Sequence, residues 1–91
     1  MTRILTLSEQ KRLKEVAKDI ELRCKFLDSS SASYIRYFAL YRELNNMIIL
    51  NRADDDFGLT ALEYFMENTD VQAFINKHVL IADNVVQLNR N

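Results

Sequence analysis

The sequence predicts an all-α protein, a compact bundle of four helices without strands. Proline is absent and glycine occurs once, at Gly58, whereas both residues punctuate chains that are rich in strands and loops. Apolar residues recur at three- and four-residue spacing over long stretches, and no segment shows the two-residue alternation of a strand. Short polar runs interrupt this periodicity where Ser, Thr and Asp can cap helices.

The first helix is expected from about residue 6 to residue 27. Thr6 and Glu9 have the spacing of a capping box, and residues at helical spacing form a core face: Leu13, Val16, Ala17, Ile20, Cys24 and Leu27. Leu22 and Phe26 fall on the opposite side, where the fold alone does not require apolar residues. We therefore expect them to contact a partner, unless the N-terminal Ile4–Leu5 segment covers them.

The second helix is expected over residues 31–51, after a polar break at residues 28–31 (DSSS). Ser30 or Ser31 is the expected cap, and so short a connection predicts an antiparallel pair with the first helix. Residues 34–50 are apolar on nearly every side, with a polar strip of only Arg36, Glu43 and Asn46. A helix of this kind should be covered by its neighbours on several sides.

Two further helices complete the predicted bundle. The third is expected over residues 60–68, capped by Thr60, or in a slightly longer form capped by Asp56. The fourth is expected over residues 70–88, because its apolar stripe continues without a change of phase. A break near His78 is the alternative.

The composition predicts a single domain over residues 1–91 in a reducing compartment. A net charge of −1 gives no general attraction to nucleic acid or to an anionic membrane. Cys24 is the only cysteine, so we interpret it as a core residue rather than half of an internal disulfide. The apolar run at the N-terminus is too short for a signal peptide and no segment reaches the length of a membrane span, so a cytoplasmic protein is expected.

Catalytic and metal-binding patterns are missing from the sequence. His78 is the only histidine and lies on an apolar stripe, which favours a core-edge imidazole. Cys24 and His78 lack a third, orienting residue. The Asp54–Asp56 run does not fit a calcium-binding loop, because setting Gly58 at position 6 leaves no glutamate at position 12. We predict neither an enzyme nor a cofactor.

Charge is unevenly distributed along the chain. There is no basic residue between Arg52 and Lys77, whereas residues 1–28 carry seven basic residues against five acidic ones. A negative end would suit a basic protein surface. The leading hypothesis is a small protein-interaction module that inhibits or bridges a larger protein, as regulators of phages and mobile elements do. Its expected partner-binding residues are Leu22, Phe26, Asp54, Asp55, Asp56, Glu63 and Glu67.

Two other functions remain open from the sequence. The first is a regulator that binds nucleic acid or a nucleotide through basic residues near tyrosines, with the candidates Lys11, Arg12, Lys14, Lys18, Arg36 and Arg42. The slightly negative net charge weighs against it. The second is a structural subunit of a homo-oligomer, for which Leu22 and Phe26 would form half of a homodimer seam.

Overall fold

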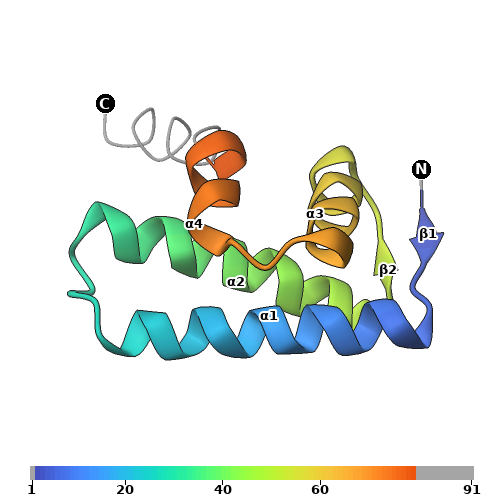
Figure 1. The fold of residues 1–91 in the computed structure, drawn as a ribbon, viewed down its shortest axis with the longest axis horizontal. Coiled ribbons are helices and arrows are strands. Elements are labelled where there is room, and N and C mark those ends of the chain that lie inside the picture. The colour runs from blue at the N-terminus through green and yellow to red at the C-terminus, as the bar shows by residue number, and fades with distance from the viewer. Residues whose placement is uncertain (1, 80–91) are drawn as a thin grey trace.

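The computed structural model describes residues 2–79 and confirms the predicted all-α bundle (Figure 1). Helices α1 (Leu7–Lys25) and α2 (Ala32–Leu50) lie side by side and antiparallel. Helix α3 (Asp56–Glu67) and helix α4 (Val71–Phe74) stand on one side of this hairpin, and α4 continues as a π-helix, η1 (Ile75–Val79). The molecule therefore has two layers, the α1–α2 hairpin and the α3–α4 layer.

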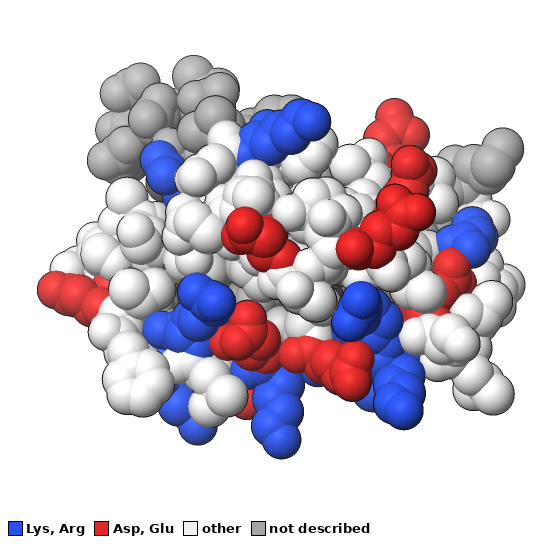
Figure 2. All heavy atoms as spheres, viewed as in Figure 1, with Lys and Arg blue, Asp and Glu red and all other residues white. Residues whose placement is uncertain are grey.

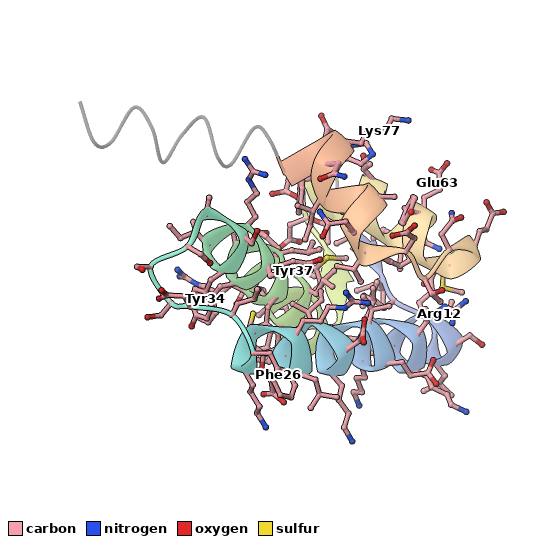
Figure 3. The ribbon with its side chains drawn as sticks, turned by 60° about the vertical axis from the view of Figure 1, so that its left-hand side comes forward. Arg12, Phe26, Tyr34, Tyr37, Glu63 and Lys77 are labelled. Carbon is pink, nitrogen blue, oxygen red and sulfur yellow. The ribbon has the colours of Figure 1, made fainter. Side chains whose placement is uncertain are left out.

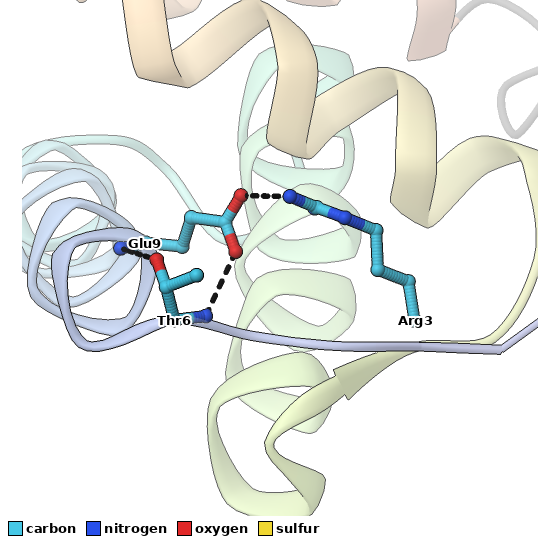
Figure 4. A network of polar contacts seen from close by, with 3 residues as sticks. All are labelled: Arg3, Thr6 and Glu9. Carbon is cyan, nitrogen blue, oxygen red and sulfur yellow. Dashed lines mark hydrogen bonds and ion pairs between the residues drawn. The ribbon is translucent and has the colours of Figure 1, made fainter.

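The capping box predicted for α1 is confirmed (Figure 4). The backbone N–H of Glu9 donates to Thr6 Oγ1 at 3.1 Å, and the backbone N–H of Thr6 donates to Glu9 Oε1 at 2.8 Å. The guanidinium of Arg3 pairs with the other carboxylate oxygen of Glu9. The side chain of Glu9 is only 6% exposed, so this network ties the N-terminal segment to the first turn of α1.

The turn between α1 and α2 is also stabilised by side-chain caps. Asp28 Oδ1 accepts hydrogen bonds from the backbone N–H and the hydroxyl of Ser30. Ser31 is the N-cap of α2, because its hydroxyl oxygen accepts from the backbone N–H of Tyr34 at 3.1 Å. These local bonds close the chain reversal that makes the hairpin antiparallel.

The prediction of no strands is wrong in one detail. Strands β1 (Arg3–Ile4) and β2 (Arg52–Ala53) form a two-residue antiparallel pair at one end of the hairpin. Asn51 ends α2 in the left-handed conformation, with φ 57°, and thereby turns β2 toward β1. Two-residue strands are too short to show alternation, so the sequence pattern could not reveal them.

Helix α3 begins four residues earlier than predicted. Its N-cap is Asp55, whose Oδ1 accepts from the backbone N–H of Gly58 at 2.8 Å, so neither Thr60 nor Asp56 is the cap. Gly58 lies in the first turn of α3, where an added Cβ would be 3.5 Å from the sulfur of Met47 and 3.6 Å from the Cβ of Ala53. These are ordinary contact distances, and the closest atom to such a Cβ would be Oδ1 of the capping Asp55, at 3.2 Å.

The expected fourth helix is not a continuous α-helix. Asp70 is its N-cap, and the α-helix gives way to the π-helix after Phe74. Residues 80–88 of the predicted helix lie outside the described residues. The π-helix begins at Ile75, and the side chains of Phe74 and Ile75 are both buried.

The core lies between the two layers. Helix α2 contributes Tyr37, Leu40, Leu44 and Met47 to it, and α3 and α4 supply the aromatic side chains that pack against them. The prediction that α2 is covered on several sides is wrong for its outer side, since Ile35, Phe38 and Ile49 are 36%, 40% and 70% exposed. No helix within residues 2–79 has the length and apolarity needed to cross a membrane.

Candidate functional site

A ladder of three aromatic rings lies on the outer side of α2. The Phe38 ring stacks on Tyr34, one helical turn before it, with centroids 5.7 Å apart and an interplanar angle of 8°. It also stacks on Tyr41, one turn after it, at 6.3 Å and 25°. The three rings line one side of a groove, and α1 provides the other side with Glu21, Cys24 and Lys25.

The chemistry of this groove does not suit a nucleophilic cysteine. Burial and the nearby negative charge of Glu21 raise the pKa of the Cys24 thiol, which disfavours the thiolate. His78 belongs to a different pocket, beside α3, where its ring lies tilted at 35° against Phe74 with centroids 4.6 Å apart. The core-edge interpretation of His78 agrees with this position, and the two residues do not share a pocket in the described structure.

The arginines and lysines of α1 have different environments. Arg12 donates to the backbone carbonyl of Phe65 at 2.7 Å and lies 3.9 Å from Glu15, and Arg23 donates to Asp19 at 3.1 Å. Within the described residues, by contrast, no ion pair engages the lysines of α1, namely Lys11, Lys14, Lys18 and Lys25. Glu21, four residues before Lys25, accepts from the Tyr41 hydroxyl at 3.4 Å.

The unpaired lysines follow the outer side of the hairpin. Gln10 and Glu21 contact α2 through side-chain hydrogen bonds, and Lys14, Lys18 and Lys25 continue that side of α1 at three- and four-residue spacing. Figure 2 shows Lys and Arg side chains projecting along the edge where α1 runs. We use the name hairpin face for this surface, defined by Lys11, Lys14, Lys18, Leu22, Lys25, Phe26, Tyr34, Phe38, Tyr41 and Arg42.

Leu22 and Phe26, which the sequence singled out, are solvent-exposed at the same end of the hairpin. Leu22 is 45% exposed and Phe26, the residue that ends α1, is 87% exposed. Ile4 cannot cover them, because β1 lies at the opposite end of α1 (Figure 1), and Leu5 is buried in the core. Figure 3 shows Phe26 beside the turn and Arg12 on the side that faces α3.

The run of three aspartates has mainly structural contacts. Asp54 accepts two hydrogen bonds from Arg52, at 2.7 and 2.9 Å, and one from Thr2. Asp55 is the N-cap of α3, and Asp56 lies in the first turn of that helix, where its charge suits the helix dipole. The fold therefore accounts for these three residues without a ligand.

Replacing Asp55 with alanine is expected to lower the free energy of unfolding by about 1 kcal/mol, because the backbone N–H of Gly58 loses its capping oxygen. Asp54→Asn is the matched control and should change stability by less than about 0.5 kcal/mol, since its ion pair with Arg52 is exposed. Urea denaturation measures both. Equal losses in the two variants would contradict the assigned cap.

The other two acidic candidates, Glu63 and Glu67, belong to a second groove. It has a volume of about 460 Å³ and lies between α3 and the start of the chain. Figure 2 shows Asp and Glu side chains gathered over α3. We use the name α3 groove for this surface, which is lined by Arg3, Glu9, Leu59, Leu62, Glu63, Met66 and Glu67.

The six basic candidates for nucleic-acid binding do not form one surface. Lys11, Lys14 and Lys18 belong to the hairpin face, and so does Arg42, one turn after Phe38. Arg12 lies against α3, and Arg36 is half-buried on the opposite edge of α2 from the ladder. Sequence reasoning missed Phe38 and Lys25, although the spacing of Tyr34, Phe38 and Tyr41 was a signal for a shared face.

No protein-family model, curated protein or solved structure matches the chain. The geometry is therefore the basis for any functional argument. Within residues 2–79 there is also no group of three or more His, Cys, Asp or Glu side chains suited to hold a metal ion. The two surfaces with unexplained chemistry are the hairpin face and the α3 groove.

Proposed function

We propose that this protein is an interaction module that binds an acidic amphipathic helix of a larger protein on its hairpin face. The observation that carries the proposal is the combination, on one face, of large exposed apolar side chains with lysines that have no ion pair in the described residues. Phe26 and Phe38 are 87% and 40% exposed. Neither feature belongs to the buried core of the bundle.

The apolar part of the face could supply most of the binding energy. Fully burying a side chain such as Phe stabilises a complex by roughly 1.5–3 kcal/mol, and Phe26 and Leu22 lie one helical turn apart on α1. The groove between α1 and the aromatic ladder runs between two antiparallel helices. A third helix fits such a groove with its apolar face inward.

The charges of the face favour an acidic partner. Five basic residues surround the apolar side chains, Lys11, Lys14, Lys18, Lys25 and Arg42, and the groove contributes one acidic residue, Glu21. Complementary charge increases the association rate and discriminates against basic partners. The partner helix should therefore carry Asp or Glu on both sides of its apolar stripe.

The same face is less suited to single-stranded nucleic acid. Bases stack on the free face of an aromatic ring, but the Phe38 ring has Tyr34 on one side and Tyr41 on the other. The net charge of −1 also weakens the attraction to phosphates. These two observations favour a protein partner over the nucleic-acid alternative.

Selection of peptides from a random library on the immobilised protein tests the proposal. We expect enrichment of helical peptides with Leu or Phe at three- and four-residue spacing and with acidic flanks. Phe38→Asp should weaken binding of the selected peptides at least about tenfold, or 1.4 kcal/mol, because it removes the centre of the ladder. Ile4→Asp is the matched control, since Ile4 is 66% exposed and lies in β1, at the opposite end of α1 from Phe26 and outside the groove.

Two results would overturn the proposal. One is peptide binding that Phe38→Asp and Ile4→Asp reduce equally, with both variants folded by circular dichroism. The other is tight binding of a fluorescent single-stranded oligonucleotide that high salt abolishes, which would identify the nucleic-acid alternative.

A further inference from the structure

Two acidic residues of the α3 groove, Glu63 and Glu67, are placed where the local structure does not favour them. Glu63 and Glu67 are four residues apart on α3, and like charges at this spacing destabilise a helix. Glu67 is also in the last turn of α3, where the helix dipole disfavours a negative charge. Within the described residues, neither carboxylate takes part in a hydrogen bond or an ion pair. Their position suggests a role outside the fold.

The α3 groove has the chemistry that the hairpin face requires of a partner. Helix α3 is itself an acidic amphipathic helix, and the groove beside it has apolar side chains between its acidic residues, with Leu59 and Met66 half-buried. Lys14 and Lys18 of the hairpin face are four residues apart, as Glu63 and Glu67 are. Both pairs therefore span about 6 Å along their helices.

We infer that the α3 groove of one molecule docks on the hairpin face of a second copy of this chain, with Glu63 and Glu67 against Lys14 and Lys18. With the two helices antiparallel, so that Glu63 faces Lys18 and Glu67 faces Lys14, Leu22 is one turn beyond Lys18 and lies opposite Leu59, the groove residue one turn before Glu63. This inference rests on the proposed use of the hairpin face and names one occupant of it. A larger partner's helix and the second copy's α3 would exclude one another, so self-association would limit access to the face.

The position of the two surfaces determines the type of assembly. The hairpin face lies on the outer side of the α1–α2 layer, whereas α3 belongs to the other layer (Figure 1). A contact between two different surfaces is head-to-tail and leaves one of each surface open, so further copies add in sequence. The assembly should therefore grow with concentration beyond a dimer.

Sedimentation velocity over a range of protein concentrations tests the inference. At about 20 mM salt we expect the weight-average mass to rise with concentration beyond that of two copies, and at about 500 mM salt to return toward one copy, because exposed charges are then screened. The double variants K14E/K18E and E63K/E67K should each weaken association at least about tenfold. An equimolar mixture of the two variants should restore it, since each then supplies the charge that the other lacks.

The control is Glu43→Lys, which reverses one exposed charge of α2 outside both surfaces and should leave association unchanged. A wild-type protein of one-copy mass at every concentration would overturn the inference, as would a mixture of folded variants that does not associate. The peptide selection separates this result from the proposed function, because E63K/E67K leaves the hairpin face intact. Peptides that still bind E63K/E67K would uphold the proposed function even where self-association fails.

Discussion

Replacing Phe74 with alanine is expected to lower the free energy of unfolding by about 3–5 kcal/mol, the range for deleting a large buried aromatic side chain. The Phe74 ring is fully buried and lies at the centre of an aromatic cluster. Its centroid is 4.9 Å from that of Phe65 and 5.1 Å from that of Tyr64, both on α3, and 5.9 Å from that of Phe57. The ring thus joins α4 to α3.

This loss is a large fraction of the free energy of unfolding of a small domain, which is typically about 5–15 kcal/mol. Urea denaturation followed by circular dichroism measures it. Phe38→Ala is the matched control, because it removes the same side chain from a position that is 40% exposed, and its cost should be well below half that of Phe74→Ala. Similar costs for the two substitutions would show that Phe74 is not a core residue.

Most of the fold could be predicted because helix caps and short turns are formed by residues that are close together in the sequence. Thr6 and Glu9 form the expected capping box and Ser31 caps α2, since both motifs depend on atoms within three residues of one another. The antiparallel hairpin follows because its connection is short. The predicted start of α3 was wrong because several residues near it could cap a helix, and the residue that does so is Asp55, through its bond to the backbone N–H of Gly58.

The candidate site was less accessible to sequence reasoning. The exposure of Leu22 and Phe26 follows from the helical periodicity of α1 alone. Whether Phe38 is covered depends on which side of α2 receives α3 and α4, and no local pattern specifies that side. The sequence could not show which basic residues of α1 are engaged within the fold and which are exposed, for the same reason. Arg12, for example, donates to the carbonyl of Phe65 on α3, which is 53 residues away along the chain.

The pKa of Glu9 makes the stability of the N-terminal end depend on pH. Burial alone would raise this pKa, but the hydrogen bond from the Thr6 backbone and the interactions with the Arg3 guanidinium outweigh burial, so the pKa lies below its ordinary value of 4.5. A carboxyl group with a lowered pKa in the folded state stabilises the fold above its unfolded pKa. That contribution is lost as the pH falls from about 4.5 through the lower pKa of the folded protein.

Glu9→Gln is therefore expected to lower the free energy of unfolding by about 1.5 kcal/mol at pH 7, because the ion pair between buried Glu9 and half-exposed Arg3 is lost and its charge-assisted hydrogen bond is weakened. The difference from wild type should shrink once the pH falls below the folded pKa of Glu9, where the native carboxyl group is also neutral. Urea denaturation at pH 7 and at pH 2–3 measures both effects. Glu15→Gln is the control: its side chain is 59% exposed and 3.9 Å from Arg12, so it should cost less than about 1 kcal/mol at pH 7. A loss for Glu9→Gln that stays the same at both pH values would show that the charge of Glu9 does not stabilise the fold.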